Sequence, residues 1–288
     1  MTVQRLTSVE PQWTAVIEPR TGFLDLRLRE LWQCRDLILL FVWRDFVAVY
    51  KQTILGPAWH VIQPLLTTLT FTLIFGRVAQ LSTDAAPSFL FYMAGTVIWS
   101  YFSTTLNKTA TTFVANAALF GKVYFHRLAV PVSVALSNLI SFAIQFALFL
   151  GFLAVYWARG KPVSPNAWMA LTPVLLLLLA LLSLGFGVVI SSLTTRYRDL
   201  VQLLQFGVQL WMYATPIVYP LSMVPARFRW IALANPLTPI VEAFRHAFLG
   251  SGDISLLHLA YSAAFTAVLL LVAAWLFNRV EQTFMDTV

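Results

Sequence analysis

The chain has 288 residues, of which 59% are hydrophobic and only 11% are charged, and its formal net charge is +7. Soluble domains carry about 25% charged residues, so the composition excludes the soluble globular class. In a membrane protein the positive charge is interpreted by where the basic residues lie relative to the spans, and we expect no nucleic-acid partner.

The N-terminal segment, residues 1–26, is polar and lacks the apolar core of a cleavable signal, so we expect it to be retained. In residues 27–52 charged and apolar residues alternate, and the longest apolar stretch is too short to span a bilayer. We predict an amphipathic cytoplasmic interface helix here, with a soluble partner-binding helix as the alternative. At about 100° per residue Arg35 falls on its apolar face as an exception, and that face gathers Leu31, Ile38, Leu39, Val42, Phe46 and Val49.

Six long runs contain no Asp, Glu, Lys or Arg: 52–76, 85–107, 128–158, 162–195, 200–226 and 254–278. A helix crosses the hydrocarbon core of a bilayer with about 20 apolar residues, so each run is long enough to span it. The runs predict an all-α polytopic membrane protein with six transmembrane helices. From the remaining residues we expect no separate soluble catalytic domain.

The basic residues predict the orientation of the spans. With the N-terminus inside, thirteen Lys and Arg residues lie in the inner segments and six lie in the outer loops. Because basic residues are retained on the cytoplasmic side during insertion, we expect both termini, including the tail 282–288, in the cytoplasm.

Two connections between the runs are longer than turns. The inner connection ends in a basic and aromatic cluster, Lys122 to Arg127, just before the third run. The outer connection, residues 221–253, carries Pro225, Asn235-Pro236 and Pro239, and its apolar stretch is too short to cross. We expect it to enter the outer leaflet as a broken helical hairpin whose free backbone groups are covered by protein.

The sequence lacks the motifs of several functional classes. It has no G-x-x-x-x-G-K-[ST], H-E-x-x-H or G-x-S-x-G motif, and its single cysteine, Cys34, excludes an internal disulfide. We therefore expect this chain to bind no nucleotide, metal or other cofactor itself. The charge-free runs also offer no Asp, Glu, Lys or Arg for ion coupling. We interpret His60 and His258, near run ends, as interfacial residues rather than proton relays.

Glu242 is the remaining acid–base candidate, with Arg245 and His246 about one turn later. Residues i and i+3 share a helical face, so Glu242 and Arg245 are predicted to pair at the outer boundary. An ion pair that steadies the outer helix is favoured over a catalytic carboxylate, because no second acid, nucleophile or metal cluster accompanies it.

Aromatic side chains make up 15% of the chain and could line a path for sugars. Sugar rings pack their C–H faces on flat aromatic surfaces without fixed hydrogen bonds, so such a lining would let a glycan slide. An ordinary place in the interfacial aromatic belt is the alternative for any single residue. The channel-facing candidates are Trp59, Phe71, Phe75, Trp99, Tyr101, Trp211, Tyr213 and Tyr219.

Small residues and prolines predict local helix geometry. Small residues recur at intervals of four in the fourth run and predict close approach of another helix: Ser183, Gly187, Ser191 and Thr195. Pro64 in the first run and Pro216 in the fifth should kink or unwind their helices, since each removes a backbone donor.

A set of landmarks follows these runs in a characteristic order: Tyr50-Lys51, Leu55-Gly56-Pro57, Trp59, Gln63-Pro64, Phe75-Gly76, Lys122 to Phe125 with Arg127 and Pro131, Tyr197-Arg198-Asp199, Trp211, Thr215-Pro216, Tyr219-Pro220, Pro225, Asn235-Pro236, Glu242 and Arg245. Their order and spacing, over about 240 residues from Asp45 to near Glu281, resembles the permease subunit of type-2 ABC exporters. This family moves O-antigen (lipopolysaccharide), capsule or teichoic-acid polymers on a lipid carrier.

The resemblance implies a division of the chain and roles for its residues. Residues 53–281 would form the six-span permease domain, with a coupling segment at 113–127 and paired re-entrant outer gate helices at 225–250 between spans five and six. The implied residues are, for ATPase coupling, Lys122, Tyr124, Phe125, His126 and Arg127; for the cytoplasmic interface, Arg44, Lys51, Arg196, Arg198 and Asp199; and for the outer gate, Pro225, Asn235, Pro236, Glu242 and Arg245. The family often has Pro where this chain has His126, which changes the backbone constraint in the coupling segment.

The resemblance also implies the assembly. Two copies of the chain, with spans one and five facing across the two-fold axis, would form an export channel in the bacterial inner membrane. Two copies of a P-loop ABC ATPase would supply energy from ATP and Mg²⁺ to move a lipid-linked polysaccharide, most simply O-antigen. The alternatives are a membrane enzyme acting on a lipid-linked substrate at the outer face through Glu242 and His246, and an ion-coupled flippase.

Overall fold

The computed structural model describes residues 28–51, 55–120, 122–123, 125–195, 197 and 199–287. These residues form helices and no strand, which confirms the predicted all-α class. In chain order the elements are α1 (Leu28–Gln33), α2 (Arg35–Tyr50), η1 (Gly56–Ala58), α3 (Trp59–Phe71), η2 (Thr72–Val78), α4 (Ser88–Ala110), α5 (Thr112–Ala115), α6 (Ala117–Phe120), α7 (Ala129–Ala158), η3 (Ala167–Leu171), α8 (Thr172–Thr194), α9 (Leu200–Ala214), η4 (Leu221–Met223), α10 (Ala226–Ala234), α11 (Thr238–Leu249) and α12 (Leu256–Thr287).

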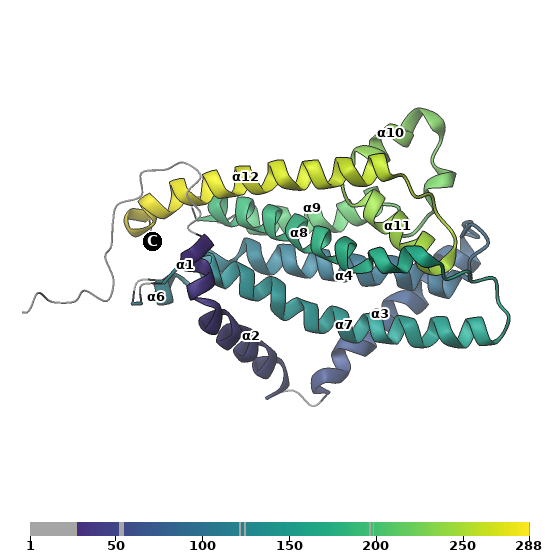
Figure 1. Cartoon of the computed structure of the whole chain (residues 1–288), viewed down its shortest axis with the longest axis horizontal. Coiled ribbons are helices and arrows are strands. Elements are labelled where there is room, and N and C mark those ends of the chain that lie inside the picture. Colours follow the sequence, from purple (N-terminus) through teal and green to yellow (C-terminus); the bar gives the residue numbers. More distant parts are fainter. Residues whose placement is uncertain are drawn as a thin grey trace, which may run out of the picture.

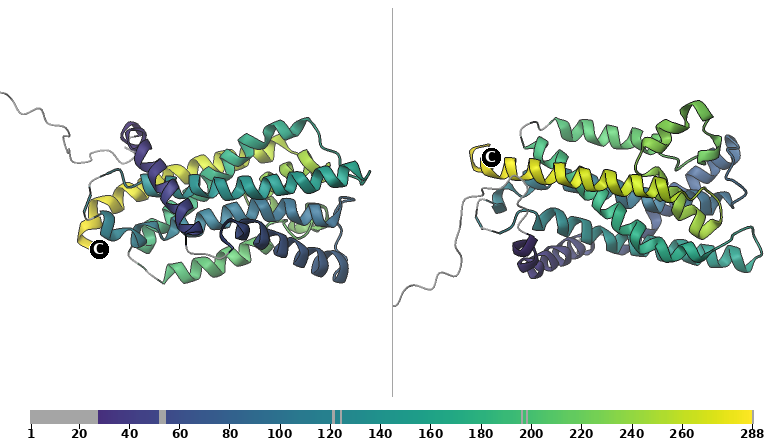
Figure 2. Two further views of the ribbon diagram at one scale, coloured as in Figure 1. Left: turned by 90° about the horizontal axis from the view of Figure 1, so that it is seen from below. Right: turned by 45° about the horizontal axis from the view of Figure 1, so that its top comes forward.

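The long helices lie side by side in one bundle (Figure 1). α4 is its central helix, since it contacts α3, α7, α8 and α11, and α12 packs along α8. α6 and the C-terminal end of α12 lie at one end of the bundle, and α10 lies at the other (Figure 1). In both views of Figure 2, α9 lies at the edge of the bundle.

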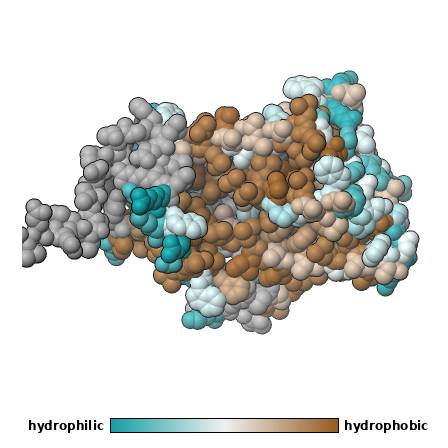
Figure 3. All heavy atoms as spheres, in the orientation of Figure 1, coloured by the Kyte–Doolittle hydropathy of each residue, from teal (hydrophilic) through white to brown (hydrophobic). Residues whose placement is uncertain are grey.

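Four helical stretches are long and apolar enough to cross a membrane: Trp59–Val78, Ala129–Ala158, Ala167–Thr194 and Leu256–Val280. They correspond to the first, third, fourth and sixth charge-free runs. The second run forms α4, which has 23 residues, and the fifth forms α9, which has 15. Hydrophobic side chains cover the middle of the face seen in Figure 3, and polar residues gather at the end that carries α10.

The predicted interface helix is divided at Cys34 into α1 and α2. α2 packs on α7, and its Ile38 and Phe41 are buried. Leu39, which was predicted on the apolar face of the interface helix, is 61% exposed. Arg35 and Leu39 are one turn apart and share the face turned away from the protein, because the contact with α7 selects the stripe that contains Ile38 and Phe41.

α8 approaches α4 closely, as its small residues predicted. A Cβ added at Gly187 would lie 2.5 Å from Cβ of Thr109 in α4. The hydroxyl of Thr194 donates to the carbonyl of Ala110 at 3.0 Å, and the hydroxyl of Ser191 accepts from the N–H of Phe113 at 3.3 Å. The small face therefore permits close packing and also satisfies backbone groups where α4 ends.

The outer connection forms two helices, α10 and α11, which are broken at Asn235-Pro236. Side chains of α12 cover backbone groups at the break: the Tyr261 hydroxyl donates to the Ala234 carbonyl at 2.8 Å, and the Ser262 hydroxyl donates to the Pro236 carbonyl at 2.7 Å. α11 is almost fully buried and α10 is largely exposed. The break is thus held by protein contacts, as expected for a broken hairpin.

Candidate functional site

A cavity of about 390 Å³ opens between α3, α4 and α7, and we call it the α3–α4–α7 cleft. Its lining is polar for a site between apolar helices, with one lysine, one histidine, three amide side chains and several hydroxyls. The polar lining residues are His60, Gln63, Thr67, Thr96, Ser100, Ser103, Thr104, Lys108, Asn138, Ser141 and Gln145.

The two prolines that were predicted to kink or unwind their helices lie in different settings. Pro64 lies inside α3, which continues past it, and its ring lines the cleft. The hydroxyls of Thr68 and Thr96 lie 3.2 Å apart and join α3 to α4 beside the cleft. Pro216 has the stronger effect, since α9 ends at Ala214 and irregular backbone follows.

Polar side chains of α4 and α7 meet at the wall of the cleft. Nζ of Lys108 donates to Oδ1 of Asn138 at 3.2 Å, and Nδ2 of Asn138 donates to the Thr105 hydroxyl at 3.1 Å. Gln145 lies two turns further along α7 and is only 6% exposed, and its Oε1 has no hydrogen-bond partner. Gln145 is therefore a buried acceptor without a protein donor. Leaving such an atom unsatisfied costs about 1–3 kcal/mol.

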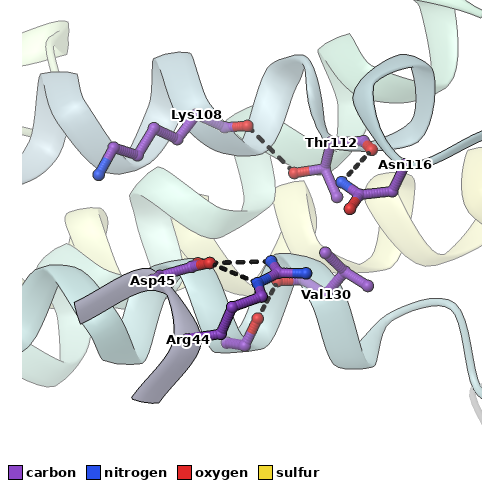
Figure 4. Close-up of polar contacts among 7 residues, drawn as sticks. Arg44, Asp45, Lys108, Thr112, Asn116 and Val130 are labelled. Carbon is purple, nitrogen blue, oxygen red and sulfur yellow. Dashed lines mark hydrogen bonds and ion pairs between the residues drawn. The ribbon is translucent and has the colours of Figure 1, made fainter. Parts of the chain in front are cut away.

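The end of the cleft at Lys108 carries a positive charge balance. Arg44 of α2 donates to Oδ1 of Asp45 through Nη2 at 2.8 Å and through Nε at 3.0 Å. Lys108 extends from α4 on the facing side of this pair, as Figure 4 shows. Two cations and one carboxylate leave one net positive charge beside this end of the cleft.

The predicted channel aromatics separate into two groups. Trp59, Phe71, Trp99 and Tyr101 line the cleft. The hydroxyl of Tyr101 donates to the Ala135 carbonyl at 3.2 Å, so that residue also ties α4 to α7.

The other four candidates do not line the cleft: Phe75, Trp211, Tyr213 and Tyr219. Trp211 packs edge-on against Phe102 and Phe186, with ring centroids 5.2 and 5.0 Å away. Tyr213 is 47% exposed on α9. The Tyr219 hydroxyl donates to the Tyr213 carbonyl at 3.1 Å.

The predicted coupling segment contains α5, α6 and the turn that leads into α7. Lys122 is exposed, whereas Phe125 packs between Phe41 and Phe120, with centroids 5.9 and 5.6 Å away. His126 is 6% exposed and stacks on Phe277 of α12 at 6.3 Å. This contact turns His126 inward, and Tyr124 lies outside the described residues.

The rest of the predicted cytoplasmic residues lie near the same end. The guanidinium of Arg127 lies over the Phe120 ring at 5.9 Å. Lys51, which follows α2, and Asp199, which precedes α9, are both exposed. Arg196 and Arg198 lie outside the described residues.

Arg245 is the most deeply buried charged residue in the described part of the chain, at 1% exposure. Its Nη1 donates to the Pro216 carbonyl at 2.5 Å, and its Nη2 donates to the Ile217 carbonyl at 2.6 Å. Its guanidinium also lies 3.7 Å from the centroid of the Phe91 ring. We call this set the Arg245 anchor; it holds the carbonyls freed where Pro216 ends α9.

Glu242 completes the anchor. Its Oε1 lies 3.6 Å from Nη1 of Arg245, which is the predicted pair, and its Oε2 accepts from the Asp253 N–H at 3.4 Å. Burial raises the pKa of the Glu242 carboxyl, and the positive charge of Arg245 opposes that rise. A Cβ added at Gly95 of α4 would lie 2.8 Å from Nη2 of Arg245, so Gly95 leaves space for the guanidinium.

The other predicted gate residues lie around the ends of α10. Pro225 precedes α10. The side chain of Asn235 donates to the Thr215 hydroxyl at 2.8 Å and accepts from the Leu237 N–H at 3.1 Å. Pro236 receives the hydrogen bond from α12 described above. Among the described residues, no cluster of His, Cys, Asp or Glu could hold a metal ion.

Comparison with known proteins assigns the family. Residues 36–249 match the family model described as ABC-2 type transporter. The chain belongs to the ABC-2 type transporter family. This match spans α2 to α11, so it includes both the cleft and the Arg245 anchor. Membership in this transporter family and the four long apolar helices identify a multi-pass membrane protein.

Several ABC-2 relatives are similar over nearly their whole length. The O-antigen export system permease protein RfbA of Myxococcus xanthus is 29% identical over 264 residues, covering 91% of this chain and 98% of the relative. A protein of the same name from Klebsiella pneumoniae is 26% identical over 253 residues, covering 87% and 94%. The polysialic acid transport protein KpsM of Escherichia coli is 23% identical over 234 residues, covering 81% and 89%.

Sequence analysis missed most of the polar wall of this ABC-2 cleft. Lys108 was counted only as one of the thirteen basic residues that predict the orientation of the spans. Asn138, Ser141 and Gln145 were not considered. A signal was present, since these three residues recur at helical spacing on one face of the third run. Gly95 was also missed, because its role depends on Arg245, which is distant in the sequence.

Proposed function

We propose that this chain is the permease subunit of an ATP-driven exporter that moves a lipid-linked polysaccharide, O-antigen in the first instance, across the bacterial inner membrane. The observation that carries the proposal is the similarity, over nearly the full length, to proteins named as O-antigen export permeases. A cleft with amide, hydroxyl and aromatic side chains between apolar helices supports a carbohydrate-bearing substrate.

The membrane topology in this proposal has six spans, with α4 and α9 added to the four long apolar helices. α4 has 23 residues and is about 34 Å long, enough to cross. Its neighbours shield it from lipid, so it can carry more polar residues than an exposed span. α9 has 15 residues and needs the irregular backbone after Ala214 to complete a crossing. The α10–α11 pair then forms the re-entrant outer gate, and both termini are cytoplasmic.

The active form in this proposal is a homodimer. α9, all of whose residues are described, buries one residue fully, Val208, and leaves a row of large apolar side chains exposed. α3 likewise exposes Leu66 and Leu69, and it continues into η2, where Leu73 is exposed. Facing copies of α3 and α9 would cover these side chains and enclose a path wider than one chain provides. The apolar residues exposed on α9 are Leu203, Phe206 and Leu210.

Energy comes from outside the chain in this proposal. Two P-loop ABC ATPase chains bind ATP and Mg²⁺, and their closure pushes on the coupling segment at 113–127. Phe125 and His126 pack against Phe41 of α2 and Phe277 of α12, so a push there is passed to two helices at once. The permease performs no covalent step.

Deletion and complementation test the proposal. Cells that lack the chain should retain the polymer on the cytoplasmic side, and the wild-type chain should restore it to the surface and co-purify with an ABC ATPase. Lys122→Gln should reduce the stimulation of that ATPase several-fold, whereas the exposed outer residue Arg159, changed to Gln, should not. An active chain purified without any ATPase would refute the exporter.

The geometry disfavours the two alternative functions. His246 Nδ1 lies 3.0 Å from the Gly252 carbonyl, and Glu242 is held by Arg245 and by the Asp253 N–H, so both side chains have structural partners. An ion-coupled flippase would need an ionisable group near the middle of a span, whereas Lys108 lies in the last turn of α4 and the charge-free runs contain no Asp, Glu, Lys or Arg. A Glu242→Gln variant that folds and gates normally but stops turnover would restore the enzyme hypothesis.

A further inference from the structure

We propose that the α3–α4–α7 cleft binds the phosphate-linked sugar at the head of a lipid carrier, with the phosphate at Lys108 and the sugar toward Gln145. This inference rests on the proposed function, since it names the part of the exported substrate that this subunit holds.

The size of the cleft fits a head group rather than a polymer strand. Thr96 and Lys108 both line it from α4, and they are about 18 Å apart along a helix that rises about 1.5 Å per residue. Its volume of about 390 Å³ lies at the small end of the range for ligand sites, which is roughly 300–1,000 Å³. A diphosphate with one or two sugar rings fills such a space.

The charge of the cleft fits an anion at its inner end. Among the described residues, no Asp or Glu lines the cleft, and Lys108 is its one lysine. The nearby carboxylate of Asp45 is held by Arg44 through two hydrogen bonds, so it does not cancel the Lys108 charge fully. An ammonium is a compact point charge with three donors, of which Asn138 receives one, and phosphate oxygens suit the others.

The opposite end of the cleft fits a sugar. Gln145 presents a buried amide oxygen without a protein donor, and a sugar hydroxyl would supply that donor. Trp99 and Phe142 line the same cleft and offer flat apolar surfaces to the C–H face of a ring. Amide acceptors together with aromatic surfaces match the two chemical faces of a sugar.

The position of the cleft fits an amphiphile that enters from the side. α3 and α7, which flank it, both belong to stretches able to cross a membrane. Trp59, at the start of α3, lines the cleft and is 48% exposed. A polyprenyl tail can therefore stay in the bilayer while its head group enters between the helices.

The test measures binding to the complex of this chain with its ATPase partner in nanodiscs. The probe is a polyprenyl diphosphate that carries one N-acetylhexosamine, and the comparison ligands are the sugar-free polyprenyl diphosphate, inorganic diphosphate and phosphatidylglycerol. We expect the sugar-bearing probe to bind most tightly. Lys108→Gln should weaken both polyprenyl diphosphates roughly tenfold, and Lys108→Arg should recover most of that loss. Gln145→Leu should weaken the sugar-bearing probe alone, roughly fivefold.

Matched controls and a cell assay separate the outcomes. Lys161→Gln removes an exposed outer lysine and should leave binding unchanged, and each variant should still co-purify with the ATPase. Equal competition by phosphatidylglycerol, binding of inorganic diphosphate as tight as that of the sugar-bearing probe, or unchanged binding in Lys108→Gln would overturn the site. If the wild-type chain restores polymer export while these variants bind normally, the site falls and the proposed function stands. If the wild-type chain restores no export, the proposed function falls first.

Discussion

Replacing Arg245 by Met removes the cation of the Arg245 anchor and keeps most of its volume. The substitution deletes two charged hydrogen bonds, to the Pro216 and Ile217 carbonyls, together with the contact to the Phe91 ring. It also leaves the buried Glu242 carboxyl without its counter-ion.

The two single substitutions of this pair should differ widely in cost. A charged hydrogen bond contributes about 1.5–3 kcal/mol, and breaking a buried ion pair costs about 3–5 kcal/mol. These terms overlap, so we expect Arg245→Met to lower the free energy of unfolding by roughly 5 kcal/mol. Glu242→Gln leaves both carbonyl bonds of Arg245 intact and removes a pair whose atoms are 3.6 Å apart, so we expect a loss of about 1 kcal/mol.

Thermal unfolding of the purified complex in detergent measures both variants. At about 2–4 °C per kcal/mol, Arg245→Met should lower the midpoint by roughly 10–20 °C and Glu242→Gln by about 2–4 °C. Adding Glu242→Gln to Arg245→Met should recover part of the loss, because it removes the unpaired carboxylate. Equal midpoints for the two single variants, or a larger loss in Glu242→Gln, would show that the carbonyl bonds do not hold the outer segment.

Three further predictions test other contacts of the bundle. Gly187→Ala would place a Cβ 2.5 Å from Thr109 and should lower the unfolding midpoint by several degrees, whereas Gly151→Ala, with no atom within 4 Å, should not; equal midpoints would contradict this packing. Asn235→Ala removes hydrogen bonds of 2.8 and 3.1 Å at the α10–α11 break and should cost about 1–2 kcal/mol in thermal unfolding, with an unchanged midpoint as the opposing result. Phe41→Ala opens the contact between α2 and the coupling segment and should lower the ATPase rate of the complex several-fold; an unchanged rate would argue against coupling through α2.

Local patterns predicted the parts of the fold that depend on sequence neighbours. The spacing of Glu242 and Arg245 placed both side chains on one helical face, and the interval of four around Gly187 indicated close helix packing. Pro216 was expected to disturb its helix, and α9 does end just before it. These predictions succeeded because helical periodicity alone decides which residues share a face.

Contacts between distant segments lay beyond the reach of one sequence. Periodicity placed Ile38 and Leu39 on one apolar face, but the contact of α2 with α7 buries Ile38 and leaves Leu39 exposed. His126 was assigned to a docking surface, and only the structure shows it stacked on Phe277. The cleft likewise requires Lys108 and Asn138 from two helices to be brought together.

The Arg245 anchor also bears on how the chain is made. Every partner of Arg245, namely Phe91, Pro216, Ile217 and Glu242, precedes it in the sequence. Synthesis runs from the N-terminus, so the carbonyls and the aromatic ring are already present when this cation leaves the ribosome. A nascent chain that stops between Ile217 and Arg245 has free carbonyls after α9, and completing α11 supplies their donor. The Arg245 anchor is therefore expected to close once α11 is complete, whereas the α10–α11 break is covered only when α12 follows.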